Sequence, residues 1–406
     1  MKKSFLSAVL LFLPAIAFLV PLVLASGCWD RREISSLAVV LGTGIDLTPS
    51  GKIRLTVQVA RPTAFVGGET GAGGKEAAAA SWTVSAEGST VEEAERNLAR
   101  FVPRQIYWGH SIVLVMGEEM AKRGIRPVLN FFQRSRQPRE NMWVMVSKGE
   151  AEKFLATYSV LEKTSSQAAG FMSLWGEGRA VHLREFSEML AKRGVQPSCS
   201  LVEVKDEGKV PSPGEEKEQA AKKQAAICGT AVFKEDRLAG FLDGEETQAA
   251  LWLMGEGFQG FVIPAPGPED PSKMVSYKMR RGKAKITPYY DGETPEFCVS
   301  VEVEGDVLEQ QGDEELAQRE TLAAVEKSVS AEMEKKMAAV LQKAQKEYGS
   351  DLFGFGEAFR RRYKREWRVV KYSWDEHFAR SRVFIQAEAR VRDFGLLVAP
   401  AGSSKD

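Results

Sequence analysis

Histidine and cysteine are the residue types of this sequence that most often carry catalysis or bind a metal, and both are sparse. The three histidines, His110, His182 and His377, show neither an HExxH motif nor an i,i+4 pair. Zinc sites and catalytic triads need histidines held close to their partner residues. We therefore predict no catalytic residues and no metal site, and we interpret His110, just before a predicted strand, as a structural hydrogen-bonding residue.

The four cysteines are too far apart in sequence for a metal or redox motif. They are Cys28, Cys199, Cys228 and Cys298, and none forms a CxxC pair. Such motifs need closer clustering. We expect Cys199, Cys228 and Cys298 to be buried free thiols, because free cysteine packs as a small hydrophobic residue.

Two glycine-rich segments imitate nucleotide-binding motifs but lack the required setting. Residues 255–260 read GEGFQG, which matches GxGxxG, yet a predicted helix precedes them and prolines follow. The dinucleotide motif functions only between a strand and a helix. Residues 68–75 end in Gly-Lys, but Glu69 replaces the first glycine of a P-loop and Glu76 replaces its Ser/Thr. We predict no cofactor.

The N-terminus has the pattern of an export signal. Lys2 and Lys3 precede an apolar run over 5–24, and the sequence Ala25-Ser26-Gly27-Cys28 follows. These small residues before a cysteine resemble a lipobox, with alanine at the position where leucine is usual. We predict a signal peptide over 1–27 and a diacylglyceryl lipid on Cys28. An uncleaved membrane helix is the alternative, because roughly 20 apolar residues can span a bilayer.

Composition limits the remaining classes of function. The chain has 406 residues, 44% of them hydrophobic, and its 55 basic residues balance 55 acidic ones. A chain of this length usually forms two or three globular domains. The charge balance removes the general electrostatic argument for nucleic acid, so we predict no nucleic-acid partner.

Strands and helices alternate through the first half of the chain. Alternating apolar residues on both sides of a Pro/Gly turn predict a β-hairpin over 36–60, and the segment 66–80 is predicted to be a loop. Thr90 has the spacing of a capping box and should open a helix through about Phe101. We assign 28–204 to an N-terminal α/β domain, whose hairpin could pack with the next domain.

The second half begins after a polar, proline-containing segment. We predict a linker over 205–226, a middle domain over 227–290 and a C-terminal α+β domain over 291–406. A long helix over 314–348 should bury one side, with apolar residues at i,i+4 spacing: Val325, Val329, Met333, Met337 and Leu341. The predicted fold class is mixed α+β, with three domains of mixed sheets and packed helices behind a lipoprotein signal peptide.

A second predicted helix follows Ser350 and has two different sides. One side carries an apolar stripe at three- and four-residue spacing: Leu352, Phe355, Phe359, Tyr363 and Trp367. The other carries basic residues over 360–368: Arg360, Arg361, Lys364, Arg365 and Arg368. We favour a core helix with a solvated basic face. Contact of that face with an anionic membrane or with a partner protein is the alternative.

Four segments in order resemble one protein family. They are CWDRREI at 28–34 running into 37–40 and 44–46; YWGH at 107–110 followed by 117–121; GTAVFK at 229–234 followed by 238–242 and 245–247; and DLFGFG at 351–356 with Trp367. Together they resemble the Ger(x)C family, the C subunit of bacterial spore germinant receptors, over nearly the whole chain after Cys28.

The resemblance implies a three-domain α/β lipoprotein on the outer face of the spore inner membrane. Such a subunit would be non-enzymatic, would work with the membrane A and B subunits, and would be needed for nutrient-triggered germination. Only the lipidation site Cys28 transfers as a functional residue. A solute-binding lipoprotein of an uptake system is the alternative function, and it would need two similar α/β lobes around a cleft.

Overall fold

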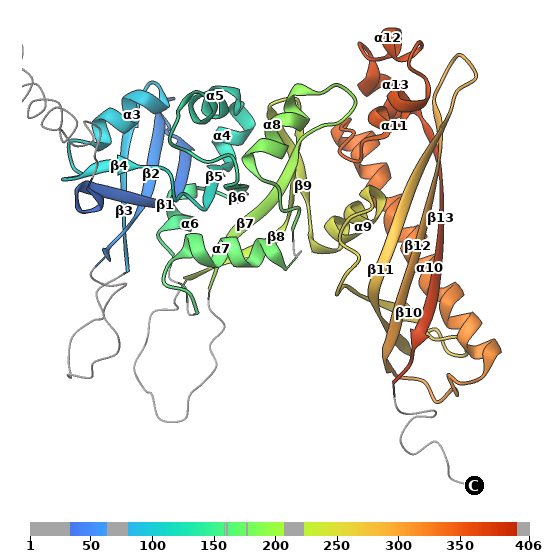
Figure 1. Cartoon of the computed structure of the whole chain (residues 1–406). Coiled ribbons are helices and arrows are strands. Elements are labelled where there is room, and N and C mark those ends of the chain that lie inside the picture. The colour runs from blue at the N-terminus through green and yellow to red at the C-terminus, as the bar shows by residue number, and fades with distance from the viewer. Residues whose placement is uncertain are drawn as a thin grey trace, which may run out of the picture.

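Two sheets lie side by side along the molecule, and helices pack on both (Figure 1). The computed structural model describes residues 33–62, 80–157, 159, 161–175, 178–206 and 223–395. The signal peptide predicted over 1–27, Cys28 and nearly all of the 66–80 loop lie outside these ranges. No helix in the described part of the chain is long and apolar enough to cross a membrane. The class is mixed α/β, as predicted.

The first sheet has nine strands in the order β3-β2-β1-β5-β6-β7-β8-β9, with β4 paired to β1. The strands are β1 (Leu37–Leu47), β2 (Ile53–Ala60), β3 (Ser81–Gly88), β4 (Gln105–Tyr107), β5 (Val113–Gly117), β6 (Trp143–Ser147), β7 (Ser198–Asp206), β8 (Lys223–Lys234) and β9 (Arg237–Leu242). Strands β1, β5, β6 and β7 are parallel. Antiparallel strands extend the sheet on both sides.

Helices cover both faces of this first sheet. One group is α3 (Val91–Leu98), α4 (Glu118–Arg123), α5 (Arg126–Arg134) and α8 (Leu183–Ala191), and the other is α6 (Ala151–Leu155) and α7 (Ser165–Leu174). Neighbouring residues of β5 enter different cores: Leu114 packs with the first group of helices and Val115 with the second. Because strand side chains alternate between faces, the central strands are buried on both sides.

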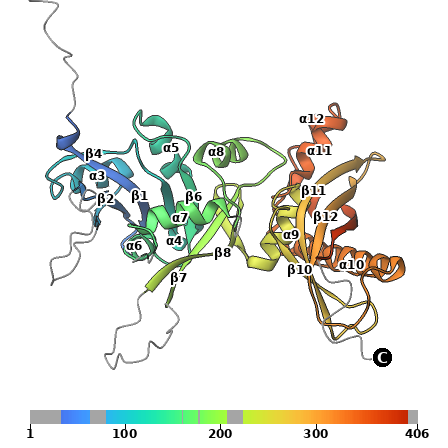
Figure 2. The same cartoon turned by 60° about the horizontal axis from the view of Figure 1, so that its bottom comes forward.

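The second sheet has four strands in the order β10-β11-β12-β13. They are β10 (Val262–Pro266), β11 (Met274–Tyr289), β12 (Glu296–Gln310) and β13 (Arg382–Asp393). The helices of this half are α9 (Gly244–Met254), α10 (Arg319–Lys343), α11 (Phe355–Arg362), α12 (Trp367–Val370) and α13 (Trp374–Arg380), and a π-helical turn, η2 (Ala344–Tyr348), extends α10. Figure 2 shows the same sheet and helices from a second direction.

Helix α10 also covers the edge of this sheet at β13. Three backbone N–H groups of β13 donate to α10 side chains: Ala387 to Glu334 (2.8 Å), Ala389 to Ser330 (3.0 Å) and Val391 to Glu326 (2.8 Å). The acceptors are spaced four residues apart on α10, and the donors two apart on β13. Helix and strand periodicity therefore match, and the side chains satisfy donors that an open sheet edge would expose.

Several sequence predictions are confirmed. The 36–60 hairpin is β1 and β2, and Thr90 accepts a hydrogen bond from the N–H of Glu93 (3.1 Å) at the start of α3. All five apolar residues predicted to face the core from the long helix are buried. The hairpin pairs with β3 and β5 inside the first sheet, not with strands from the middle segment.

Other predictions need correction. Helix α3 ends at Leu98, before Phe101, and the helix predicted over 314–348 starts only at Arg319 as α10. The helix predicted from Ser350 is three short helices, because Gly354 adopts a left-handed conformation (φ 82°) before α11 and the chain leaves the helical path again at Tyr363. Apolar spacing alone does not report these breaks.

The sheets divide the chain differently from the predicted domains. At the ends of the segment predicted as a linker, Asp206 pairs with Lys223, so both sides of the segment belong to one sheet. The predicted middle segment contributes β8 and β9 to the first sheet and β10 and β11 to the second. The predicted boundary at 290 falls between β11 and β12, which form one antiparallel hairpin.

A close backbone contact joins the two halves. The N–H of Glu357 donates to the carbonyl of Gly194 (3.2 Å). A Cβ atom on Gly356 would lie 2.4 Å from the Cα of Gly194, and one on Gly194 would lie 2.7 Å from the ring of Trp367. Gly194 also has a φ of 89°. The two chain segments can come this close because both Gly194 and Gly356 lack a side chain. We call residues 194–198 and 350–357 the seam.

Polar groups in the seam are paired across the two halves. The N–H of Gln196 donates to the carbonyl of Asp351 (2.7 Å), and the hydroxyl of Ser350 donates to the carbonyl of Phe233 (2.7 Å). The buried Arg179 guanidinium donates to the hydroxyl of Ser198 and to the carbonyl of Leu352 (3.1 Å). Burial lowers the pKa of Arg179, since desolvation disfavours the cation.

The Asp351 carboxylate fixes the start of α11. It accepts hydrogen bonds from the backbone N–H groups of Gly354 (3.0 Å), Phe355 (3.1 Å) and Gly356 (2.8 Å), and from the indole N–H of Trp374 (2.9 Å). Burial raises the pKa of Asp351 to about 6, although these hydrogen bonds oppose the rise. The carboxylate thus satisfies donors that the first turn of a helix leaves free.

The close packing in the seam leads us to expect that one added methyl group at Gly356 lowers the stability of the fold. Gly356→Ala should destabilise residues 29–406 by about 1–3 kcal/mol, because the backbone of Gly194 cannot move away from the new Cβ without disturbing the seam. Gly244→Ala is the control, because nothing lies within 4 Å of a Cβ at Gly244. Urea denaturation measures both. Equal unfolding midpoints for Gly356→Ala and the parent would show that the seam is not tightly packed.

Candidate functional site

A basic surface with exposed apolar residues lies over α11 and α12. We define the α11–α12 surface by its exposed side chains: Arg360, Arg361, Lys364, Arg365, Arg368, Val369 and Tyr372. Val369 is 75% exposed and Tyr372 is 71% exposed. Glu366 is exposed in the same segment, so the surface is mainly but not uniformly basic. Exposed apolar side chains beside charged ones are typical of an interaction site. This surface brings together the basic residues predicted to share a helix face.

An aromatic cluster supports this surface from below. Phe355 and Phe359 are fully buried and Trp367 is nearly so, as predicted for the apolar stripe. The ring of Phe359 lies 5.1 Å from that of Tyr363 and 5.7 Å from that of Trp374. The stripe therefore belongs to the core of the second half, and only the basic side of α11 and α12 remains for contacts.

Much of the positive charge on this surface has no carboxylate partner. Arg360 pairs with Glu357 (2.9 Å). Within the described ranges, Lys364, Arg365 and Arg368 form no ion pair. The surface can therefore attract an acidic partner without first breaking internal salt bridges, which makes it a candidate contact for a protein or a lipid.

Arg193 from the first half also contributes to this surface, and its position could not be predicted from the sequence. The guanidinium of Arg193 lies 4.9 Å from the centre of the Tyr372 ring, and its Nη1 donates to the carbonyl of Lys371 (3.4 Å). Arg193 is 178 residues before Lys371 in the chain. No local pattern signals that pair. The signal that the sequence did contain was an apolar residue, Val369, next to basic residues of the same segment.

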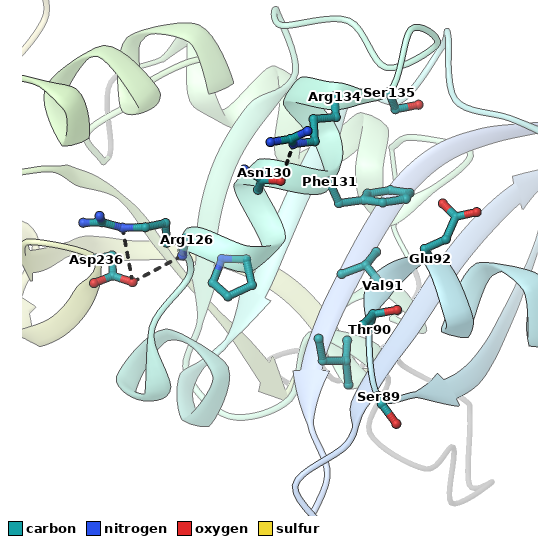
Figure 3. A pocket seen from close by; sticks show the side chains of 12 residues that line it. Ser89, Thr90, Val91, Glu92, Arg126, Asn130, Phe131, Arg134, Ser135 and Asp236 are labelled. Carbon is teal, nitrogen blue, oxygen red and sulfur yellow. Dashed lines mark hydrogen bonds and ion pairs between the residues drawn. The ribbon is translucent and has the colours of Figure 1, made fainter.

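A separate hollow of about 790 Å³ lies between α3 and α5 (Figure 3). Its wall includes Phe131 on α5 and Val91 on α3, and Glu92 stands at its edge. Asp236 accepts from the N–H of Arg126 (3.4 Å) and lies 4.0 Å from its guanidinium. The hollow is open and has charges of both signs, and its polar groups do not form a nucleophile–base arrangement.

The histidines and cysteines lie apart from one another in the described part of the chain. His182 stacks on Trp143, with ring centres 3.7 Å apart, and His110 lies edge-on to Tyr107. Cys199, Cys228 and Cys298 are free thiols; Cys199 is buried as predicted, but the other two are only half-buried. Burial raises the pKa of the Cys228 thiol to about 11, so it is largely protonated near neutrality. In the described ranges, no three His, Cys, Asp or Glu residues group as metal ligands.

The GEGFQG segment forms a turn between a helix and a strand. Gly255 ends α9 in a left-handed conformation (φ 81°), and Gly257 and Gly260 also have positive φ. Strand β10 follows at Val262. The prediction that no helix begins after this motif is confirmed. The glycines adopt the positive φ angles that the turn between α9 and β10 requires.

Acidic residues from two of the four family-like segments, the first and the last, accept hydrogen bonds from helix N-termini. Asp46 on β1 accepts hydrogen bonds from the N–H groups of Ala151 (2.7 Å) and Glu152 (2.9 Å), which begin α6 about 100 residues later. Desolvation raises the pKa of Asp46, while these hydrogen bonds oppose the rise. Asp351 does the same for α11. Asp46 and Asp351 thus connect parts of the chain that the local sequence does not bring together.

Comparisons with known proteins identify a family for both parts of the chain. Residues 30–204 match the family described as spore germination protein N-terminal domain, and residues 228–395 match spore germination B3/GerAC like, C-terminal. Spore germination protein KC of Bacillus subtilis (strain 168) is 28% identical over 394 residues, covering 94% of this chain and 95% of that protein. Spore germination protein YndF of the same organism is 26% identical and covers 94% and 97%.

A solved structure shares the fold. The crystal structure of the GerBC protein superposes with a TM-score of 0.53 at 22% identity, covering 89% of this chain and 99% of GerBC. The two family matches follow each other in order, and the relatives extend over nearly the full chain. The resemblance drawn from the four sequence segments is thereby confirmed, and the chain belongs to the Ger(x)C family of spore germination proteins.

Proposed function

We propose that this chain is the lipid-anchored C subunit of a spore germinant receptor, which acts by binding and assembly and not by catalysis. It works with the membrane A and B subunits at the outer face of the spore inner membrane. The observation that carries the proposal is the full-length similarity to spore germination proteins, with both family domains present in order.

The lipid on Cys28 is part of this proposal. Export followed by acylation is supported by the two N-terminal lysines, the apolar run and the small residues that precede Cys28. Two acyl chains would hold the protein stably, whereas one chain holds it only marginally. The first described residue, Glu33, is only five positions after Cys28. The folded part would therefore stand close to the lipid surface.

The α11–α12 surface is the candidate face for assembly. It combines positive charge that is largely without carboxylate partners with exposed Val369 and Tyr372, and the buried aromatic cluster packs beneath it. Acidic loops of a membrane subunit have the complementary charge. The alternative of a solute-binding lipoprotein gains no support from the architecture, because the nine-stranded and four-stranded sheets are not two similar lobes.

Replacing the acylated cysteine tests the anchor. Cys28→Ala should abolish incorporation of labelled lipid and move the protein from the membrane pellet to the supernatant in detergent-free, high-salt buffer. Cys298→Ala is the matched control, because Cys298 is a half-buried free thiol and should leave both properties unchanged. Firm retention of Cys28→Ala in the pellet would instead indicate an uncleaved membrane helix.

Removal of the chain tests its physiological function. Spores lacking it should lose germination with the nutrients sensed by its receptor, while vegetative growth remains normal, because a receptor lacking one subunit cannot assemble. Germination counts with single nutrients measure the effect, and expression of the unaltered chain should restore it. Normal germination with every nutrient, together with a defect in solute uptake, would support the solute-binding alternative.

A further inference from the structure

We propose that the N-terminal end of the first sheet is a membrane-contact surface that rests on anionic phospholipid headgroups. We define this N-terminal surface by Ile34, Trp82, Arg100, Phe101 and Arg104. The inference depends on the proposed lipid anchor at Cys28, and it adds a specific orientation: the folded protein lies against the bilayer through this end, not through the α11–α12 surface.

The length of the tether places this end near the membrane. Five residue steps separate Cys28 from Glu33, and an extended chain spans at most about 3.3–3.6 Å per residue, roughly 18 Å in total. Directly after Glu33, the residues Ile34, Ser35 and Leu37 line a hollow of about 720 Å³. An acylated Cys28 would therefore keep this hollow within reach of the headgroup layer.

Large apolar side chains from three segments are exposed around the hollow. Ile34 is 80% exposed, Phe101 is 66% exposed and Trp82 is 39% exposed. Ile34 and Trp82 line the hollow, and Phe101 directly precedes Val102, which also lines it. Aromatic side chains are enriched where protein meets the bilayer interface, because one part of the ring is apolar and the edge tolerates water.

The charge of this end suits an anionic surface. Arg61 and Arg104 line the hollow, and its lining contains no acidic residue. Arg100 and Arg104 are exposed, and neither forms an ion pair within the described part of the chain. The hollow between α3 and α5 differs, since Glu92 and Asp236 line it. Anionic lipids attract arginines held near the membrane surface.

The fold keeps these residues in place before any membrane contact. Val102 and Ile106 are 6% exposed and anchor the segment that carries Arg100, Phe101 and Arg104. Strand β4 pairs with β1 in parallel, with Ala38 opposite Ile106. The surface therefore needs little ordering to bind, which reduces the entropic cost of contact.

A depth-sensitive probe tests the orientation in the full lipidated chain. The chain is reconstituted in phosphatidylcholine vesicles with or without phosphatidylglycerol, and an environment-sensitive dye is attached at Ser35→Cys, an exposed position beside the hollow. Lipids with nitroxide-labelled headgroups quench a dye that lies in the interface. Val369→Cys on α12 carries the comparison probe, and the parent chain gives the background from the native thiols.

Quenching should be strong at Ser35→Cys and weak at Val369→Cys, and it should be greater with phosphatidylglycerol. Retention in vesicles after a salt wash is measured separately: loss of retention would refute the lipid anchor. Retained protein with an unquenched Ser35→Cys probe would overturn the membrane-contact surface alone. Quenching of Val369→Cys instead would assign membrane contact to the α11–α12 surface.

Charge reversal completes the test. Arg100→Glu with Arg104→Glu should lower quenching at Ser35→Cys by about half or more in phosphatidylglycerol vesicles, while the lipid still retains the protein. The matched control, Arg361→Glu with Arg365→Glu, should leave that quenching unchanged. All four arginines are exposed, so the melting temperature should hardly move. Equal quenching in both double variants would contradict the electrostatic part of the inference.

Discussion

A fully buried carboxylate, Asp351, is the group on which the arrangement of the two halves depends. A charge inside a protein must be hydrogen-bonded, and Asp351 meets that requirement with three backbone N–H groups and the indole of Trp374. These bonds begin α11 and hold the aromatic cluster. The carbonyl of the same residue accepts from Gln196 in the first half. One residue thus connects the α11–α12 surface to the nine-stranded sheet.

This connection gives the proposed subunit two separate ends. Helix α3 and strand β4, between which Arg100, Phe101 and Arg104 lie, are at one side of the molecule and α12 is at the other in both views (Figure 1, Figure 2). The first end has apolar and basic residues near the proposed lipid, and the second has basic residues beside Val369 and Tyr372.

The features that could be predicted from sequence were those set by local periodicity. The alternation around the 48–51 turn predicted a hairpin, and apolar residues four apart predicted the buried side of α10. The seam could not be predicted, because Arg179 and Leu352 meet across 173 residues. For the same reason, the polar segment at 205–226 indicated a linker although its two ends pair in one sheet. Of the candidate sites, the basic face was predictable, but its contact with Arg193 was not.

The most direct test of this account is the difference in unfolding free energy between the parent and Asp351→Asn from about pH 4 to about pH 7. In the folded state the pKa of Asp351 is raised to about 6. Its contribution to the free energy of unfolding is therefore greatest at low pH and decreases as the pH rises through about 6. Both carboxyl oxygens of Asp351 can accept hydrogen bonds even when one is protonated near pH 4, whereas the amide nitrogen of asparagine cannot accept, so two of the four donors lose their acceptor. The parent should therefore be more stable by about 1–3 kcal/mol near pH 4, with a smaller advantage near pH 7. A difference of zero throughout, or one that grows with pH, would contradict the role assigned to Asp351.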